Sequence, residues 1–405
     1  MTVVSLLPIA GGSSNSTDFN DVNFRDYDGT IVNSYSASDF LALSAMPNNP
    51  SHDELTSQGW NWLLSDAKAY VTEYGKLEIG QMYITDDGKT RIYIHLDNSD
   101  FLSPYLVIAV NGTVVVDWGD GSNMDTMTGT SNTTLKYQQH VYATTGDYTI
   151  TLNPTSGSFA FYGASDHASV LRTVGAADNR ARSQAYSNAI TKIEIGSSAY
   201  IGNYGFQKIS KCKSITIPSS VTSIESNAFY YCYALRSITI PSGVTSITNY
   251  TFGYCYTLQS ITISSSVTSI AGYAFSYCYT LQSITIPSSV TSIGSYAFYY
   301  CYALQSITIP SSVTIIWNYA FGYCYTLQSI TIPSDVTSIG NNAFAYCYDM
   351  REYHILPTTV PAFGTNVFSG IMSGTVIYVP SGMLNAYQTA TNASTYASYM
   401  QEEPA

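Results

Sequence analysis

Charged side chains are scarce in this sequence. Of its 405 residues only 10% are Asp, Glu, Lys or Arg, whereas about a quarter is usual for a soluble protein. The net charge is −12, which opposes binding to nucleic-acid phosphates and to anionic lipid head groups. We therefore expect neither nucleic acid nor a membrane surface among the partners.

Long apolar runs are missing as well. No stretch approaches the roughly 20 apolar residues that a bilayer-spanning helix needs, so we expect no membrane insertion. The segment MTVVSLLPIAGGSSNS (residues 1–16) has no basic start, and Pro8 interrupts its short apolar part. It is not expected to act as a secretory signal, and the sequence has no LPxTG sortase motif. We interpret residues 1–20 as a flexible leader.

Sequence signals of catalysis and metal binding are also missing. The histidines are scattered, and no G-x-S-x-G, H-E-x-x-H, P-loop or dinucleotide-binding motif occurs. No Cys-x-x-Cys pair or Cys/His cluster suggests a metal site. We therefore expect no enzyme, no catalytic residue, no metal site and no cofactor.

Tyrosine and a repeated segment dominate the composition instead. Tyrosine occurs 37 times. From Cys232 onward each cysteine follows the previous one by 23 residues, at positions 255, 278, 301, 324 and 347. A parallel row of phenylalanines occupies positions 206, 229, 252, 275, 298, 321 and 344. A fixed period of this length indicates a solenoid.

One unit of the repeat, SITIPSSVTSIGSYAFYYCYALQ, covers residues 283–305. Ile284 and Ile286 alternate with hydroxyl residues, which predicts a short strand with one buried face. Further along, helical spacing predicts a short turn of helix with Ala297, Phe298, Cys301 and Leu304 on its buried face. A single unit has too few apolar side chains to fold alone, so we expect the units to stack. The cysteines are then buried structural thiols.

The pattern ITIP-x-x-V-x-x-I-x-x-x-AF-x-x-C-x-x-L resembles the BspA-type leucine-rich repeats of bacterial surface proteins. The resemblance covers nearly half of the chain. We place the solenoid at residues 156–380 and a C-terminal cap at residues 381–405. Members of that family are adhesins and ligand-binding proteins, so the resemblance implies that the solenoid binds a partner.

Residues 100–155 carry a second signature. The motifs VDWGDGS (Val116–Ser122) and HVYATTGDYTITL (His140–Leu152) resemble those of the PKD-type immunoglobulin-like β-sandwich. The resemblance implies a spacer or interaction module. We expect Asp117 and Asp120 to shape the tight turn rather than bind a metal.

Residues 21–99 are interpreted as a small α+β domain. VNFRDYDGTIVNSY resembles part of the internalin B-repeat, a helix is expected at residues 65–75, and MYITDDGKTRIYIHL predicts a hairpin around Asp87 and Gly88. Residues 153–189 are interpreted as a linker that becomes the N-terminal cap of the solenoid. The predicted fold is mainly β: a leucine-rich-repeat solenoid preceded by a PKD-like β-sandwich and a small α+β N-terminal domain.

Candidate binding residues lie in the solenoid, where no charged residue or histidine occurs between Arg236 and Asp335. The candidates are the strand threonines Thr239, Thr262, Thr285 and Thr308 and the tyrosines Tyr250, Tyr273, Tyr296 and Tyr319. Tyrosine offers rigid contact area and a hydroxyl group. Two alternatives stay open: the hydroxyl residues are simply favourable in exposed strands, and the tyrosines, above all those beside each cysteine, pack between repeats.

These observations favour adhesion: a non-enzymatic protein, extracellular or on a bacterial cell surface, that binds a surface glycan or protein through the solenoid. Two alternatives remain. One is a bacteriophage virion component, such as a tail-associated receptor-binding or decoration protein, which also implies assembly into a larger structure. The other is a structural spacer.

Overall fold

The computed structural model describes residues 22–25, 31–48, 55–60, 68, 71, 77–85, 87–163, 170–173 and 180–404. The predicted leader and most of the predicted helix at residues 65–75 lie outside them. The chain divides into two compact units, Met1–Gly88 and Lys89–Ala405, and each is described by itself.

The first unit is a small mixed sheet with one short helix packed on it. The strand order is β2-β1-β4-β3, and α1 begins after Ser36, whose hydroxyl accepts a hydrogen bond from the Asp39 N–H. Val22, Phe24, Phe40 and Val71 form its core. The elements are β1 (Val22–Arg25), β2 (Ile31–Tyr35), α1 (Ala37–Ala42), β3 (Leu55–Trp60) and β4 (Leu77–Thr85).

The hairpin predicted around Asp87 and Gly88 is wrong. The first part of β4, up to Gly80, pairs with β1, and its last part, from Gln81 to Thr85, pairs with β3. The next strand, β5 (Thr90–Leu96), pairs with β8 and β10. The Asp-Gly pair and the period-two pattern report a local bend and a strand. They do not predict which strand pairs with β5, whose two partners, β8 and β10, come from much later in the sequence.

The second unit starts with a sheet that continues into the solenoid. Its order is β15-β13-β12-β10-β5-β8-β6-β7. The described strands of residues 100–155 are hydrogen-bonded into this one sheet, and the predicted two-sheet PKD-like sandwich stays a prediction. Its first elements are η1 (Ser99–Phe101), β6 (Tyr105–Asp117), β7 (Asp125–Gln139), β8 (Gly146–Phe161), β9 (Leu171–Arg172), α3 (Arg180–Ala189), β10 (Ile190–Glu194) and β11 (Ala199–Ile201).

The stretch interpreted as a linker, residues 153–189, is structured over its described part. It contains the end of β8, the strand β9 and the helix α3. Tyr186 and Ala189 of α3 belong to the main hydrophobic core, so the helix covers the start of the solenoid. Two of its small residues, Ser183 and Ser187, are buried, and their hydroxyl groups form hydrogen bonds with Thr173 and with Leu171 O.

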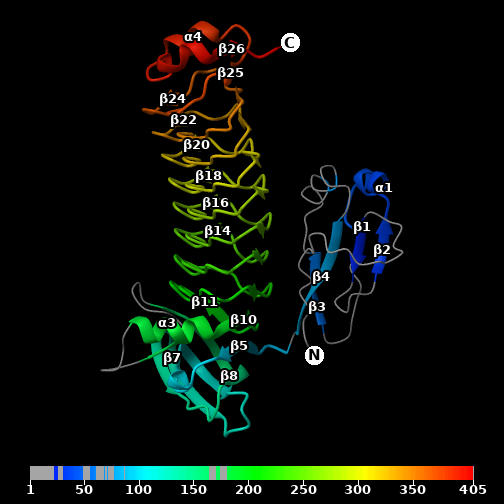
Figure 1. Cartoon of the computed structure of the whole chain (residues 1–405), viewed down its shortest axis with the longest axis vertical. Coiled ribbons are helices and arrows are strands. Elements are labelled where there is room, and N and C mark those ends of the chain that lie inside the picture. Colours follow the sequence, from blue (N-terminus) through cyan, green and yellow to red (C-terminus); the bar gives the residue numbers. More distant parts are fainter. Residues whose placement is uncertain are drawn as a thin grey trace. The chain divides into compact units, whose positions relative to one another are not determined.

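The solenoid coils through two rows of short parallel strands, one along each side (Figure 1). The first row comprises β12 (Ser214–Thr216), β13 (Ser237–Thr239), β15 (Ser260–Thr262), β17 (Ser283–Ile284), β19 (Ser306–Ile307), β21 (Ser329–Ile332), β23 (Glu352–Ile355) and β25 (Val376–Val379). The second row comprises β14 (Ser246–Ile247), β16 (Ser269–Ile270), β18 (Ser292–Ile293), β20 (Ile315–Ile316), β22 (Ser338–Ile339) and β24 (Ala362–Phe363).

One hydrophobic core runs through the whole second unit, from Ile92 to Met400. The phenylalanine row stacks along it: the ring centroids of Phe252 and Phe275 are 5.6 Å apart, and those of Phe298 and Phe321 are 5.3 Å apart. The prediction that the repeats pile into one continuous, mainly β solenoid is therefore confirmed.

The predicted turn of helix in each repeat is wrong. The segment around Ala297 and Cys301 forms tight turns, because Tyr296 and Tyr300 have left-handed φ angles of 61° and 60°. Its backbone N–H groups bond to the next repeat: Phe298 N donates to Ala320 O at 2.8 Å, and Tyr300 N to Gly322 O at 3.0 Å. The four side chains predicted to be buried are buried, but turns and not a helix place them there.

The C-terminal residues close the solenoid at its far end (Figure 1). The strand β26 (Met400–Glu402) pairs with β25 in parallel. Tyr387 is buried, and its hydroxyl donates to Pro357 O at 2.6 Å. The two short helices of this end are α4 (Leu384–Thr389) and η3 (Ser394–Tyr399).

Candidate functional site

The outward side chains of β13, β15, β17, β19 and β21 form what we call the strand face. Inward isoleucines fix this orientation because successive strand residues point to opposite sides. The strands are in register: Ser237 lies opposite Ser260, Thr239 opposite Thr262, and Ser283 opposite Ser306. Equivalent hydroxyl groups therefore recur at the strand spacing of about 4.7–4.9 Å.

The strand face is accessible and uncharged. Thr308 is exposed, whereas Thr239, Thr262 and Thr285 are half-buried. The serine and glutamine side chains that precede the threonines along the chain are exposed. They are Ser260, Ser283, Ser306 and Ser329, and Gln259, Gln282, Gln305 and Gln328. Rows of hydroxyl and amide groups thus face solvent in a fixed two-dimensional pattern.

The outer tyrosine column consists of Tyr250, Tyr273, Tyr296 and Tyr319. Their φ angles lie between 54° and 61°, in the left-handed region that bulky residues rarely occupy. The same slot is asparagine at both ends of the column, where Asn227 and Asn342 have φ angles of 60° and 56°. Asparagine suits this backbone, so tyrosine is the unusual choice in the middle repeats.

Rings of the outer tyrosine column stack face to face. The centroid separations are 4.4, 4.5 and 4.8 Å, and neighbouring planes lie within 10° of parallel. Burial raises the pKa of Tyr250, Tyr273 and Tyr296 above the ordinary value. All four side chains are half-buried. A partner therefore meets ring edges and hydroxyl groups, because neighbouring rings cover the faces.

Two further tyrosine columns flank the cysteines. The first contains Tyr254, Tyr277, Tyr300 and Tyr323, and the second contains Tyr256, Tyr279, Tyr302, Tyr325 and Tyr348. Successive rings in both lie 4.3–5.3 Å apart. The structure thus shows the flanking tyrosines stacking between repeats, the alternative that the sequence left open.

The threonine and outer tyrosine candidates lie on different sides of the solenoid. In one turn, Ile284 of β17 and Ile293 of β18 are buried in the same core from two different sheets. Thr285 comes directly after Ile284, and Tyr296 comes three residues after Ile293. The two candidate sets therefore do not make one joint site.

All seven cysteines are buried free thiols. The Cys301 Sγ–H donates to Phe275 O of the preceding repeat at 3.2 Å, and Cys278 repeats the bond with Phe252 O at 3.3 Å. Burial raises the pKa of Cys212 and Cys347 to about 12. Such thiols stay protonated at neutral pH, which agrees with a structural role.

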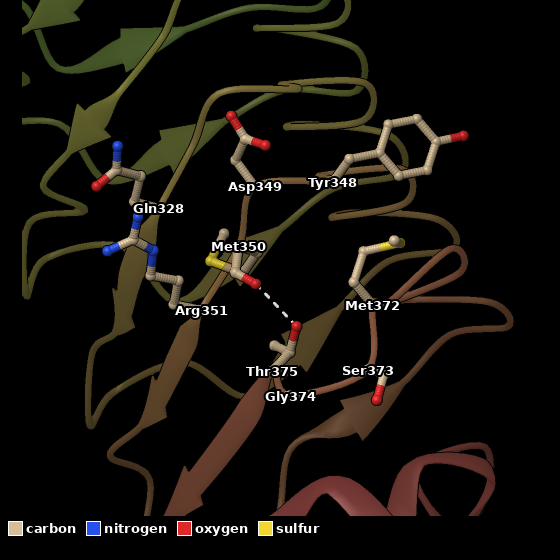
Figure 2. A pocket seen from close by; sticks show the side chains of 9 residues that line it. All are labelled: Gln328, Tyr348, Asp349, Met350, Arg351, Met372, Ser373, Gly374 and Thr375. Carbon is tan, nitrogen blue, oxygen red and sulfur yellow. Dashed lines mark hydrogen bonds between the residues drawn. The ribbon is translucent and has the colours of Figure 1, made fainter.

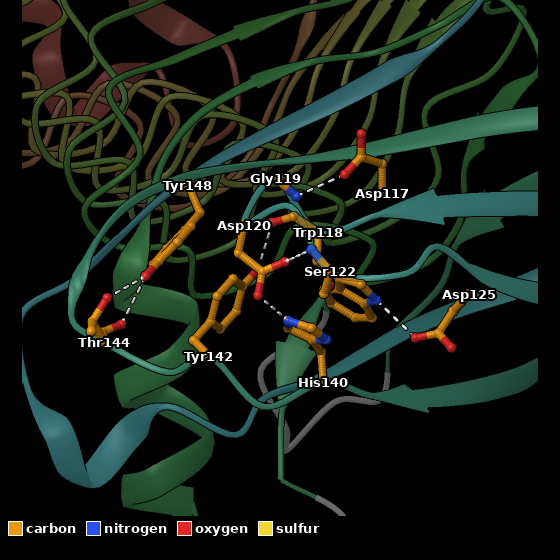
Figure 3. Close-up of polar contacts among 10 residues, drawn as sticks. All are labelled: Asp117, Trp118, Gly119, Asp120, Ser122, Asp125, His140, Tyr142, Thr144 and Tyr148. Atoms are coloured by element: carbon orange, nitrogen blue, oxygen red, sulfur yellow. Dashed lines mark hydrogen bonds and ion pairs between the residues drawn. The ribbon is translucent and has the colours of Figure 1, made fainter.

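The WGDG and HVY motifs meet in a compact polar cluster (Figure 3). Trp118 stacks on His140 at 4.6 Å, and His140 Nε2 lies 2.8 Å from the Asp120 carboxylate. Asp120 and Asp117 also accept hydrogen bonds from the N–H groups of Ser122 and Gly119. Every polar group shown has a structural partner, so the prediction that these carboxylates shape the turn is confirmed.

A pocket of about 400 Å³ opens near the C-terminal end of the solenoid (Figure 2). None of the residues predicted to bind a partner lines it. Its lining residues are Gln328, Tyr348, Asp349, Met350, Arg351, Met372, Ser373, Gly374 and Thr375. Asp349 and Arg351 depart from the uncharged consensus at their repeat positions, and this departure is the signal that could have found the site.

Comparison with protein families agrees with this geometry. The BspA-type leucine-rich repeat region matches residues 181–304 and 268–396, in six copies. These matches cover more than half of the sequence. The chain belongs to the BspA-type leucine-rich-repeat family.

Solved structures of other repeat proteins are similar to this BspA-type protein. A leucine-rich-repeat protein of T. pallidum is 28% identical, with a TM-score of 0.38, 40% of this chain covered and 81% of that chain. One from Bacteroides ovatus is 24% identical, with a TM-score of 0.36 and coverages of 54% and 68%. The pneumococcal vaccine antigen PcpA is 22% identical, with a TM-score of 0.34 and coverages of 47% and 62%. No curated protein matches the sequence.

The described part of this BspA-type protein contains no group of three or more His, Cys, Asp or Glu side chains placed to hold a metal ion. Among the described helices none has the length and apolar character to cross a bilayer. The features that remain as candidate binding sites are the strand face, the edges of the outer tyrosine column and the pocket at the end of the solenoid.

Proposed function

We propose that this chain is a non-enzymatic protein of a bacterial cell surface that binds an uncharged stretch of glycan or protein through the strand face. Its membership of the BspA-type family supports the surface location, because the repeats resemble those of bacterial surface proteins. The observation that carries the binding proposal is the in-register array of exposed serine and glutamine side chains with exposed or half-buried threonines between them.

An array of this kind favours an extended partner. Each hydroxyl or amide contributes one modest hydrogen bond of about 0.5–1.5 kcal/mol, so useful affinity needs several in a row. The rigid core holds the rows in place before binding, which lowers the entropic cost of association. Because no charge is involved, affinity should change little with salt.

The sheet of β5, β6, β7 and β8 is proposed to act as a rigid mount for the solenoid, in line with the spacer role that the PKD resemblance of residues 100–155 implies. The backbone supports this. β10 pairs with β5 of the mount on one edge and with β12 of the solenoid on the other. Force on the solenoid would pass directly into this sheet.

Matched sets of variants test the strand face. Thr262→Val, Thr285→Val and Thr308→Val together remove three hydroxyl groups from adjacent repeats and keep strand-favouring side chains. The control carries the same change at the exposed threonines Thr268, Thr291 and Thr314, which lie beside the second row of strands. A third variant converts the outer tyrosine column to asparagine, the residue that the chain itself has at positions 227 and 342.

Binding of the full chain to glycan and extracellular-matrix arrays is then measured at low and high salt. We expect the strand-face triple variant to lose at least about tenfold in affinity, from roughly 0.5–1.5 kcal/mol per hydrogen bond, while both other variants bind normally. Loss in the control triple variant, loss in the tyrosine variant alone, or binding of uncharged glycans that collapses with salt would each refute the strand face as the site.

A spacer is the second candidate, and the stacked tyrosines favour it. Three tyrosine columns satisfy much of their aromatic surface within the chain, which stiffens the solenoid without a partner. This candidate predicts no binding on any array together with a rod of constant length in small-angle scattering. A specific ligand on the strand face would exclude it as the sole function.

A further inference from the structure

The pocket at the end of the solenoid exists because the repeat changes there. Glu352 of β23 lies opposite Val376 of β25, one residue more than the regular period. Thr375 takes the slot of the buried Leu327 and Met350: it is buried, and its N–H donates to the carbonyl three residues earlier, as theirs do. The exposed Gly374 precedes it. Its φ is 94°, and a Cβ placed on it would meet no atom within 4 Å. The glycine therefore puts no side chain over the corner of the last regular turns, while Thr375 closes the core with a hydroxyl bond to Met350 O at 2.8 Å.

Two unlike charges enter this corner. Asp349 takes the slot of Thr326, and Arg351 takes the slot of Gln328, so Arg351 continues the exposed glutamine row of the strand face. Backbone bonds from Asp349 N to Tyr325 O and from Arg351 N to Gln328 O keep both residues in register. Both are exposed. In the part of the chain that the structure describes, neither charged group has an ion-pair partner.

The other side of the pocket is apolar. Tyr348 is the last ring of the second flanking column, with Tyr325 against one face at 5.3 Å. The next residue in that slot is Met372, not tyrosine. Tyr348 and Met372 are 44% and 51% exposed. Figure 2 shows them on one side, with Gln328 and Arg351 on the other and Asp349 between. An aromatic ring at the end of a stack can offer a face, which the rings within the columns cannot.

We propose that this pocket binds a sugar residue that carries a carboxylate. The Arg351 guanidinium pairs with the carboxylate through two parallel hydrogen bonds. The Asp349 carboxylate accepts hydrogen bonds from the ring hydroxyl groups, and the Gln328 amide N–H donates to them. The C–H face of the sugar packs against Tyr348 and Met372. A volume of about 400 Å³ lies within the range of small-ligand sites.

This assignment deepens the proposed function and rests on it in one respect. A glycan lying along the glutamine row of the strand face would arrive at Arg351, because Arg351 is the next member of that row. The pocket would then select glycans that end in, or contain, an acidic sugar, while the strand face holds the neutral stretch.

Methionine methyl signals of the full chain provide a direct readout, since Met350 and Met372 line the pocket. The chain has nine methionines, and Met372→Leu assigns one signal. Titration uses D-glucuronate, with D-glucose and acetate as matched probes that lack the carboxylate or the ring. The variants are Arg351→Gln and Asp349→Thr, which restore the residues of the preceding repeat and should therefore fold.

We expect glucuronate to shift Met372 and Met350 selectively, glucose and acetate to shift them much less, and Arg351→Gln to weaken glucuronate binding at least about tenfold. The Thr262, Thr285 and Thr308 triple variant should keep glucuronate binding, which separates failure of the strand face from failure of the pocket. Equal binding of acetate would mean a simple anion contact. Tighter binding of a free peptide carboxylate, or no shift at all, would also overturn the assignment.

Discussion

At the scale of single residues, the outer tyrosine column combines an unfavourable backbone with favourable ring contacts. A left-handed backbone costs a non-glycine residue roughly 1–2 kcal/mol, and asparagine tolerates it better than tyrosine does. Stacking of two aromatic rings returns about 0.5–1.5 kcal/mol beyond area burial. The two terms are of similar size, so the column persists without a large net gain or loss in stability.

This balance predicts how substitutions at Tyr273 behave. Tyr273→Ala loses both ring neighbours and keeps the strained φ of 58°, so it should destabilise the chain by about 1–2 kcal/mol. Tyr273→Asn loses the same rings but relaxes the backbone, and should stay within about 1 kcal/mol of the unmodified chain. Urea unfolding measures both. Equal destabilisation by the two variants would show that the left-handed slot carries no cost.

The Asp120 carboxylate gives the mount a defined acid sensitivity. Burial opposes its ionisation, but hydrogen bonds from Ser122 and His140 lower the pKa of Asp120 to about 2 from the ordinary 3.8. Since the folded-state pKa is the lower one, the stabilising contribution is complete above pH 3.8 and is lost as the pH falls toward 2. Asp120→Asn should lower stability at neutral pH by about 1–2 kcal/mol and lose part of this acid dependence.

Unfolding curves between pH 2 and 7 check the acid dependence. Asp117→Asn serves as the control, because Asp117 accepts a hydrogen bond from Gly119 N in the same turn, whereas the bond to His140 is made by Asp120 (Figure 3). The prediction would be contradicted if the stability of the Asp120→Asn variant fell with decreasing pH as steeply as that of the unmodified chain.

At the scale of elements, the strands of the solenoid could be predicted from sequence and the turns between them could not. Ile284 and Ile286 alternate with hydroxyl residues, and that pattern has one simple strand solution. Ala297, Phe298, Cys301 and Leu304 share a face in a helix and also in the observed turns. Only the left-handed φ of Tyr296 and Tyr300 decides between them, and tyrosine gives no sequence signal for that conformation.

The C-terminal strand β26 covers one edge of β25. β26 pairs with β25 through Ile377 and Met400, and Tyr387 and Tyr396 cover the end of the core. Deleting residues 381–405 would bare the N–H and C=O groups of β25, a template for pairing with another chain. We expect larger species than the full chain forms, measured by light scattering during size-exclusion chromatography.

A milder variant provides the control for this deletion. Tyr387→Phe removes only the hydroxyl bond to Pro357 O and leaves the strand edge covered. It should lose about 1 kcal/mol of stability and keep the size of the full chain. If the deleted chain also kept that size, the edge would not need the cap.

At the scale of the whole molecule, repetition made the solenoid predictable and its irregular ends difficult. Each unit that matches the consensus predicts the same local structure, so the units support one another. The end pocket has no second copy: it depends on an exposed glycine, Gly374, in the last turn and on Asp349 and Arg351 replacing uncharged residues. The strand β5 was difficult for the same reason, since its partners β8 and β10 are set by tertiary structure and not by a local pattern.

The pairing of β5 leads to a prediction about fragments. β5 lies between β8 and β10 and buries Ile92, Ile94 and Leu96. A fragment of residues 89–405 keeps this strand and should unfold cooperatively. A fragment of residues 100–405, cut at the boundary that the sequence suggested, loses it, bares two strand edges and opens the core where the mount meets the solenoid. It should aggregate or unfold at lower urea. Coincident urea transitions of the two soluble fragments, followed by circular dichroism, would show that β5 is dispensable and that the solenoid does not depend on its mount.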